Sequence, residues 1–183
     1  WISPDELISK DGKKYLKNDK SKQVKIGPSE SMSKSKRNTI DPENIINNYG
    51  ADSVRLFILS DSPPEKDVQW SEDGIIASFK FIQKLWSLNE KVLGEINKNH
   101  TKDNSDELTK FTNRFVKKIS NNLENFNYNI IIANLHEMHS YLSKEVIKGY
   151  QKKTILENYK KILITMMPIL PHLSNECIES IKT

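Results

Sequence analysis

The chain has 183 residues, of which 36% are hydrophobic and 28% are charged. This length supports one or two domains with a real core, and no stretch approaches the roughly 20 apolar residues that a membrane-spanning helix needs. Cys177 is the only cysteine, which excludes an internal disulfide framework and a thiolate-rich zinc site.

The positive charge of the chain is concentrated near its N-terminus. Residues 1–40 carry ten Lys/Arg and five Asp/Glu, whereas the remaining residues carry 18 and 19. This asymmetry favours an anionic ligand at the N-terminal end. The first residues lack the pattern of a secretion signal, so we expect a cytoplasmic protein.

Residues 1–30 alternate short polar and apolar runs around a turn signal at Asp11-Gly12. This pattern predicts a small hairpin or irregular strands near 13–16 and 23–26.

Residues 31–38 read Ser-Met-Ser-Lys-Ser-Lys-Arg-Asn, a short loop rich in hydroxyl groups and positive charge. Ammonium groups meet phosphate oxygens as point charges, and hydroxyls and backbone amides can complete a polyphosphate site. Lys34, Lys36 and Arg37 are the candidate phosphate contacts. On composition alone, a solvated basic loop without a ligand is the favoured alternative.

A short helix is predicted over about 43–48, because Asp41-Pro42-Glu43 supplies a cap, a residue suited to the first helical position and an early acid. Gly50 suits the end of this helix. A second helix is predicted from Ala51 to Ser60, before Pro63-Pro64 breaks the pattern.

Four longer amphipathic helices follow, each with apolar residues three or four positions apart. Their stripes are Ile75, Phe79, Ile82 and Trp86; Phe111, Phe115, Ile119 and Leu123; Ile131, Leu135, Met138 and Leu142; and Ile155, Tyr159, Ile162, Met166 and Leu170. Ser71 is expected to cap the first of them, and Pro168 and Pro171 to kink or end the last. The polar run 100–106 is expected to be the longest connection. Such helices pack as an up-down bundle, so we expect a mainly α chain with a small irregular β and loop region.

Few side chains outside the loop suggest chemistry. Cys177 is expected to be an inert thiol on a helix. His136 and His139 stand three residues apart on a predicted helix, but two imidazoles without a third ligand make a poor metal site, so no metal site is predicted.

Several motifs resemble one enzyme family, the class I aminoacyl-tRNA synthetases. Met32-Ser33-Lys34-Ser35 resembles their KMSKS signature loop, and Tyr49-Gly50-Ala51-Asp52 resembles a turn that isoleucyl, valyl and methionyl enzymes share. The segment Pro63-Pro64-Glu65-Lys66-Asp67, followed by Trp70-Ser71 and Leu85-Trp86, resembles the leucyl-tRNA synthetases specifically. Trp1-Ile2-Ser3-Pro4 resembles their leucine-specific insertion, and Pro171-His172-Leu173-Ser174 resembles the close of their helical domain.

The resemblance implies an ATP-dependent ligase for leucine and tRNA-Leu, probing tRNA mainly through its sugar–phosphate backbone. In such an enzyme Lys34 is the catalytic residue, and magnesium arrives with ATP as part of the substrate. The implied ATP-binding residues are Met32, Ser33, Lys34, Ser35 and Lys36. The expected tRNA-binding residues are Arg37, Arg55, Lys80, Lys84 and Arg114. Residues 1–62 would close the catalytic domain with the stem-contact helices, and residues 63–183 would form an anticodon-binding helical bundle.

The loop departs from the family pattern at its first position, where Ser31 replaces a lysine. We hypothesise that Lys36 or Arg37 partly compensates for the missing charge. The second family signature, a His-x-Gly-His motif, is absent, so the chain alone is expected to be inactive, and it is expected to act as part of a monomeric enzyme. Two alternatives stay open: a valyl or isoleucyl synthetase fragment, and a non-catalytic tRNA-binding helical module.

Overall fold

The computed structural model describes residue 2, residues 6–61, residue 63, residues 65–98, residue 100 and residues 106–182. The chain divides into two compact units, Trp1–Ile45 and Ile46–Thr183.

The first unit contains a small antiparallel sheet. Its strands are β1 (Leu7–Lys10), β2 (Lys13–Leu16) and β3 (Gln23–Val24), in the spatial order β1-β2-β3. Asp11 and Gly12 form the β1–β2 turn with φ values of 51° and 73°, the left-handed region that a tight hairpin turn requires. The two predicted strands are confirmed, the second in shortened form. β1 falls outside the prediction, because its sequence Leu-Ile-Ser-Lys shows no alternation.

Two short helices follow the loop region. They are α1 (Pro42–Tyr49) and α2 (Ala51–Asp61), and both confirm the predicted helices with nearly the same bounds. The carboxylate of Asp41 accepts a hydrogen bond from the backbone N–H of Glu43 at 3.0 Å, as expected of a helix cap. Gly50 separates the helices at φ 80°, a conformation that glycine adopts without strain.

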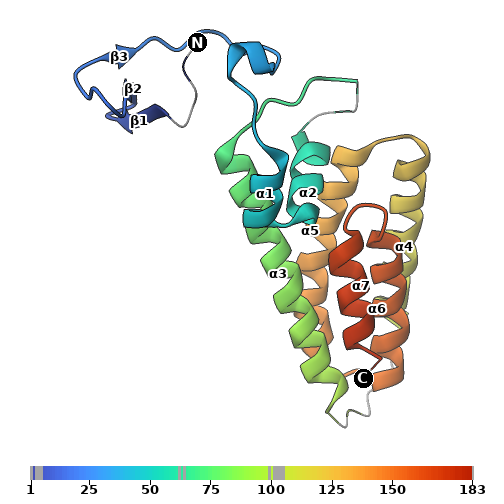
Figure 1. The fold of residues 1–183 in the computed structure, drawn as a ribbon. Coiled ribbons are helices and arrows are strands. Elements are labelled where there is room, and N and C mark those ends of the chain that lie inside the picture. Colours follow the sequence, from blue (N-terminus) through green and yellow to red (C-terminus); the bar gives the residue numbers. More distant parts are fainter. Residues whose placement is uncertain are drawn as a thin grey trace. The chain divides into compact units, whose positions relative to one another are not determined.

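The second unit is built around α3 (Glu72–Ile96), α4 (Asp106–Glu124), α5 (Tyr128–Glu145) and α6 (Lys152–Met166). α3 and α4 each pack against both α5 and α6, so the four helices enclose one core. Successive helices run in opposite directions, as Figure 1 shows, which confirms the predicted bundle. No helix within the described ranges combines the length and apolar character needed to cross a membrane.

α7 (Pro171–Ser180) completes this unit after a short turn at the end of α6. Pro171 occupies the first turn of α7, where its fixed φ and missing N–H are tolerated. The predicted interruption near Pro168 and Pro171 is therefore confirmed, and the chain resumes as a separate helix that packs against α2, α3 and α6. The short helix η3 (Val146–Lys148) follows α5 directly. Most of the predicted connection 100–106 lies outside the described residues.

The predicted core faces of α5 and α6 are confirmed, because every residue of those two stripes is buried. In α4, Phe115 and Ile119 are buried, while Phe111 and Leu123 are partly buried against the core.

The predicted core face of α3 is confirmed only in part, since Ile75 is buried and Ile82 packs against the core while partly buried. Trp86 is 37% exposed, and Phe79 and Ile82 are only partly buried. The residues of α3 that belong to the hydrophobic core of the bundle are Phe81, Leu85, Leu88, Val92 and Ile96. The predicted stripe belongs to a second apolar face of α3, on which the Phe79 ring meets the ring of Tyr49 edge-on at 5.8 Å.

The domain boundary at residues 62 and 63 stays a prediction. In the structure, α2 packs against α3, α5 and α7, within the same compact unit as the bundle.

Candidate functional site

The basic loop forms a short turn of 3-10 helix, η2 (Lys34–Lys36). Ser33 has extended backbone angles and its hydroxyl accepts a hydrogen bond from the backbone N–H of Lys36 at 3.3 Å, which makes it the N-cap. Arg37 ends the turn at φ 51°, in the left-handed region. The serine and lysine pattern thus produces a compact turn at the predicted site.

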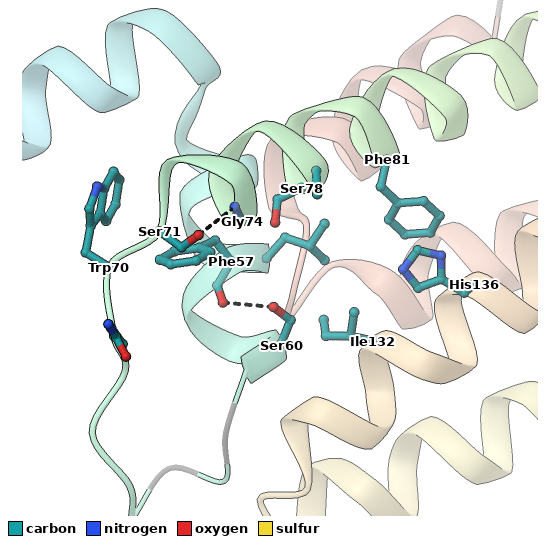
Figure 2. A pocket seen from close by; sticks show the side chains of 12 residues that line it. Phe57, Ser60, Trp70, Ser71, Gly74, Ser78, Phe81, Ile132 and His136 are labelled. Carbon is teal, nitrogen blue, oxygen red and sulfur yellow. Dashed lines mark hydrogen bonds between the residues drawn. The ribbon is translucent and has the colours of Figure 1, made fainter. Parts of the chain in front are cut away.

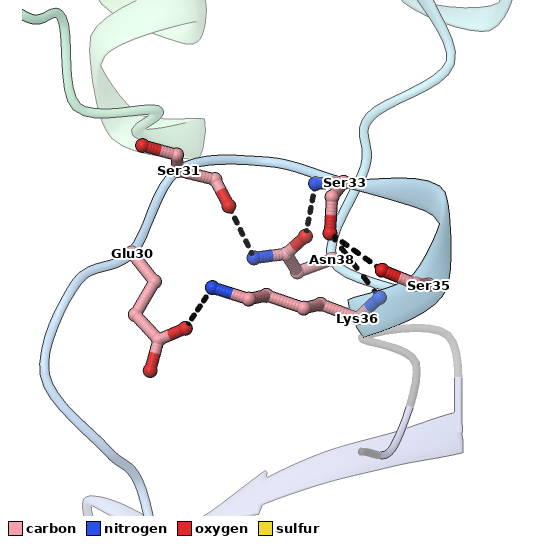
Figure 3. Close-up of polar contacts among 6 residues, drawn as sticks. All are labelled: Glu30, Ser31, Ser33, Ser35, Lys36 and Asn38. Carbon is pink, nitrogen blue, oxygen red and sulfur yellow. Dashed lines mark hydrogen bonds and ion pairs between the residues drawn. The ribbon is translucent and has the colours of Figure 1, made fainter.

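Asn38 holds the two ends of the loop together. Its side-chain oxygen accepts a hydrogen bond from the backbone N–H of Ser33 at 2.8 Å, and its amide donates to the carbonyl of Ser31 at 3.4 Å (Figure 3). An asparagine can bridge two backbone groups in this way because it carries both a donor and an acceptor. Asn38 has no role in the sequence predictions, although its place directly after the basic run was a usable signal.

The three basic residues of the loop differ in their partners. Lys36 forms an ion pair with Glu30 in Figure 3, and Arg37 lies 3.6 Å from the carboxylate of Glu6. Lys34 is exposed, and its ammonium group makes no hydrogen bond or ion pair with any other residue that the structure describes. Among the predicted phosphate contacts, Lys34 therefore has the charge most available to a ligand.

The remaining predicted ATP-binding residues surround the turn. Ser33 and Ser35 place their hydroxyl oxygens 3.2 Å apart, and the Met32 side chain is 49% exposed. The structure thus brings the predicted loop residues together. Position 31 carries a serine, and Lys36 and Arg37 already face carboxylates. Compensation for the positive charge of the missing lysine therefore stays a hypothesis.

Arg55, predicted to bind RNA, makes structural contacts. Its guanidinium donates hydrogen bonds to the backbone carbonyls of Ile169 at 3.0 Å and Pro168 at 2.6 Å. These carbonyls belong to the turn between α6 and α7, so Arg55 fastens α2 to the end of the bundle. Part of its side chain remains exposed, and an RNA contact there stays a prediction.

Asp52 makes a second link between the same elements. Its buried carboxylate accepts a hydrogen bond from the backbone N–H of Leu173 at 2.7 Å and lies 2.9 Å from the ring nitrogen Nδ1 of His172. A carboxylate at this place satisfies a free N–H group in the first turn of α7. The Tyr-Gly-Ala-Asp turn and the Pro-His-Leu-Ser segment, noted separately in the sequence, thus meet in space.

Two other predicted RNA contacts, Lys80 and Lys84, lie together in a groove between α3 and α5. The groove has a volume of about 440 Å³, and Lys91 and His139 also line it. Lys91 donates a hydrogen bond from its ammonium group to the backbone carbonyl of Ser143 at 2.6 Å. We call this set of residues the α3/α5 groove. Arg114 is exposed on α4 and does not line it.

Lys91 is not among the RNA contacts that the sequence predicts, and His139 enters those predictions only as part of a poor metal site. Lys80, Lys84 and Lys91 are spaced by four and then seven residues, which places them on one face of a helix. That spacing was a usable signal for Lys91. The approach of His139 from α5 depends on helix packing and had no local signal.

Both histidines of α5 have pKa values below the ordinary value. Burial is the main cause at His139, followed by the charge of Lys84, and Lys91 acts in the same direction. At His136 burial is again the main cause, followed by the charges of His139 and Lys84. Both imidazoles are therefore neutral at physiological pH.

A larger cavity of about 610 Å³ lies among α2, α3 and α5 and contains none of the predicted site residues. Figure 2 shows aromatic rings along it: Phe57 meets Trp70 edge-on at 5.3 Å, and Phe81 stacks on His136 at 3.7 Å. Its polar groups are largely engaged locally, since Ser60 donates to the carbonyl of Phe57 and Ser71 caps α3. We interpret it as a packing feature.

The thiol of Cys177 is unsuited to nucleophilic chemistry. Burial raises the pKa of Cys177 to about 11, so the reactive thiolate is scarce at neutral pH. This confirms the expectation of an inert thiol on a helix.

Comparison with known proteins places these features in a family. The family described as "tRNA synthetases class I (I, L, M and V)" matches residues 25–71, and the family described as "Anticodon-binding domain of tRNA ligase" matches residues 105–183. The first match contains the η2 loop, and the second contains α4 to α7.

The curated relatives of this chain include leucine–tRNA ligases. The enzyme of Bartonella henselae is 38% identical over 190 residues, which cover 97% of this chain and 22% of the relative. The enzyme of Rickettsia massiliae is 35% identical over 184 residues, which cover 96% of this chain and 21% of the relative. The chain thus spans about a fifth of the length of these relatives.

A solved structure has a similar fold. It is the LeuRS chain of a ternary LeuRS–tRNA–LeuAMS complex from Agrobacterium radiobacter, with a TM-score of 0.69 and 20% sequence identity, covering 80% of this chain and 20% of that chain.

Proposed function

This chain belongs to the leucine–tRNA ligase family of class I synthetases, and we propose that it works as part of an enzyme that joins leucine to tRNA-Leu. In the proposed reaction, the leucine carboxylate attacks the α-phosphate of ATP, which arrives with Mg²⁺. Pyrophosphate leaves, and the leucyl group passes from the adenylate to the 3′-terminal adenosine of the tRNA. We place this enzyme in the cytoplasm, as a monomer.

Two tasks in this reaction fall to the residues of this chain. The η2 loop binds the phosphates of ATP, and the helical unit docks the tRNA. The chain spans about a fifth of its relatives' length, so we assign leucine recognition to the rest of the enzyme and expect the isolated chain to be inactive.

The observation that best supports the first task is the state of Lys34. Its neighbours Lys36 and Arg37 face carboxylates, whereas the Lys34 ammonium is exposed and makes no polar contact with another described residue. A carboxylate nucleophile needs no general base, so the protein contributes mainly by positioning ATP and offsetting the negative charge that develops on its phosphates. Lys34 supplies that charge in our proposal, and Met32, Ser33, Ser35 and Lys36 complete the phosphate site.

Lys34→Ala in the full-length enzyme tests this task. We expect leucine-dependent ATP–pyrophosphate exchange to slow by roughly 10²- to 10³-fold, because an electrostatic contact to the transition state is lost. The thermal unfolding midpoint should not change, since Lys34 is exposed. Lys25→Ala, at another exposed lysine of the same unit, is the matched control and should leave the exchange rate unchanged. Exchange at the normal rate in Lys34→Ala would exclude the proposed role.

The second task is contact with the tRNA backbone. We propose that Arg37, Arg55, Lys80, Lys84 and Arg114 contribute positive charge to it. Contacts to phosphates release counterions, so tRNA binding should weaken steeply as salt rises. The convergence of Lys80 and Lys84 in the α3/α5 groove supports the contribution of these two lysines.

Two other functions fit the sequence motifs less well. A valyl or isoleucyl ligase would share the signature loop, but the two relatives described above, which match along nearly the whole chain, are leucine–tRNA ligases. Exchange that depends on valine or isoleucine in place of leucine would support this alternative. A non-catalytic tRNA-binding module would bind tRNA without any amino-acid-dependent exchange.

A further inference from the structure

The α3/α5 groove concentrates positive charge without a carboxylate to balance it. Three of its lining residues, Lys80, Lys84 and Lys91, are lysines, and none of the described residues that line it is acidic. Like charges at this spacing repel one another, so the arrangement lowers stability unless an anion enters the groove.

The nearby acids of the same two helices are engaged elsewhere. Glu90 of α3 accepts a hydrogen bond from the indole of Trp86 at 3.2 Å, and Glu137 of α5 pairs with Lys118 of α4 at 2.8 Å. These two carboxylates therefore do not neutralise the lysines of the groove, and the hydrogen bond of Lys91 to the carbonyl of Ser143 leaves its positive charge unbalanced.

His139 adds a titratable group to the same groove. It comes from α5 and faces Lys84 and Lys91 of α3. Its ring centroid lies 6.0 Å from that of Phe81 in an edge-on arrangement, and His136 is its ionisable neighbour on α5. A neutral imidazole beside three ammonium groups gains a proton more easily once an anion offsets their charge.

We infer that the α3/α5 groove binds phosphates of an RNA backbone, with Lys91 as a direct contact and His139 as a ligand that takes up a proton on binding. The inference deepens the proposed function, because it names the place and the pH response of the tRNA contact. A phosphodiester fits the groove chemically: it is anionic, it accepts hydrogen bonds from ammonium groups and from the hydroxyl of Ser87, and it needs no base-specific contact.

The direction of the pH effect follows from linkage. In the free protein the pKa of His139 lies below its ordinary value, and a bound phosphate raises it. The complex therefore holds more protons than the free protein between these two pKa values. Affinity for RNA rises as the pH falls through the pKa of the complex.

The first test uses the full-length enzyme and a tRNA-Leu transcript, with the dissociation constant measured by fluorescence anisotropy at several KCl concentrations. Lys91→Gln should weaken binding roughly tenfold and reduce the slope of log K against log salt by about 1. Lys84→Gln, as a second variant in the groove, should act in the same way. Lys110→Gln, at an exposed lysine of α4 outside the groove, should leave both quantities unchanged.

The second test compares the two histidines of α5, His136 and His139. Between about pH 8 and about pH 6, wild-type affinity should rise several-fold. His139→Gln should lose this rise, and His136→Gln, which removes an imidazole outside the groove, should keep it.

These measurements separate the two proposals. If wild-type enzyme shows leucine-dependent exchange and binds tRNA-Leu, but the Lys91 and Lys84 variants keep their affinity and salt slope, the groove inference is wrong and the proposed function stands. Binding of inorganic phosphate to the enzyme is measured alongside. If the variants lose affinity for inorganic phosphate but keep their affinity for tRNA-Leu, the groove binds free anions and not RNA, which also overturns the inference. Without tRNA binding or exchange in the wild type, the proposed function itself fails.

Discussion

Single side chains in this molecule show how residues of the same charge can have different roles. Arg55 and Lys34 are both cations in family-like motifs. Arg55 donates to the carbonyls of Pro168 and Ile169, whereas the ammonium group of Lys34 is exposed and makes no polar contact with the other described residues. The sequence alone predicts both residues as ligand contacts. Their surroundings assign Arg55 a structural task and leave Lys34 available to a phosphate.

Asp52 allows a residue-scale prediction about stability. Asp52→Ala removes the acceptor for the backbone N–H of Leu173 and leaves that N–H group buried and unpaired. We expect a loss of about 1–3 kcal/mol in the free energy of unfolding, measured by urea denaturation followed by circular dichroism. Asp73→Ala, at an exposed acid in the first turn of α3, should cost less than about 1 kcal/mol. Equal losses in the two variants would contradict the assigned role of Asp52.

At the scale of one element, α3 has two apolar faces. One face places Phe81, Leu85 and Leu88 in the bundle core, and the other carries Phe79, Ile82 and Trp86. A helix with a single stripe is oriented by its sequence, but a helix with two can be oriented only by its neighbours. The side contacts of α3 with α2 and α7 explain why it needs the second face.

The two glycines of α3 form a matched pair for testing its packing. A Cβ at Gly74 would lie 2.5 Å from the ring of Phe57, a buried side chain held against Trp70, whereas a Cβ at Gly94 would have no atom within 4 Å. Gly94→Ala should therefore stabilise the protein by up to about 1 kcal/mol, through helix propensity alone. Gly74→Ala should destabilise it by about 1–3 kcal/mol, because the clash outweighs the propensity gain. Thermal unfolding of both variants checks the opposite signs, and stabilisation of both would refute the close packing of α2 on α3.

At the scale of the whole molecule, the bundle couples its stability to pH through α5. The pKa values of His136 and His139 are lowered, mainly by burial, relative to the ordinary value of about 6.5 that an unfolded chain shows. The unfolded state therefore binds more protons over this range. The stabilisation is complete above about pH 6.5 and is lost as the pH falls through the lower folded pKa values.

We expect the unfolding midpoint to fall when the pH is lowered from about 7 to about 5, above the range in which most carboxylates titrate. Replacing both histidines by glutamine should flatten this part of the curve. An equally steep fall in the double variant would assign the pH dependence to other groups.

The sequence by itself determined the features that depend on neighbours along the chain. The spacing of apolar residues located α1 to α6, Ser71 and Asp41 indicated the helix starts, and the serine and lysine pattern of residues 31–38 identified the loop. Periodicity and capping act within one or two helical turns, so a linear pattern contains them.

Only the tertiary structure decided which face of α3 is the core, what Arg55 contacts, and that Lys91 and His139 share a groove. Asp52 and Leu173 are also joined by a hydrogen bond, although they lie far apart in the sequence. Such contacts arise when separate helices pack, and the sequence around one residue does not indicate which distant residue it will contact. The physical reason is that helix packing depends on the fit of whole surfaces, whereas a sequence pattern records only the preferences of each segment.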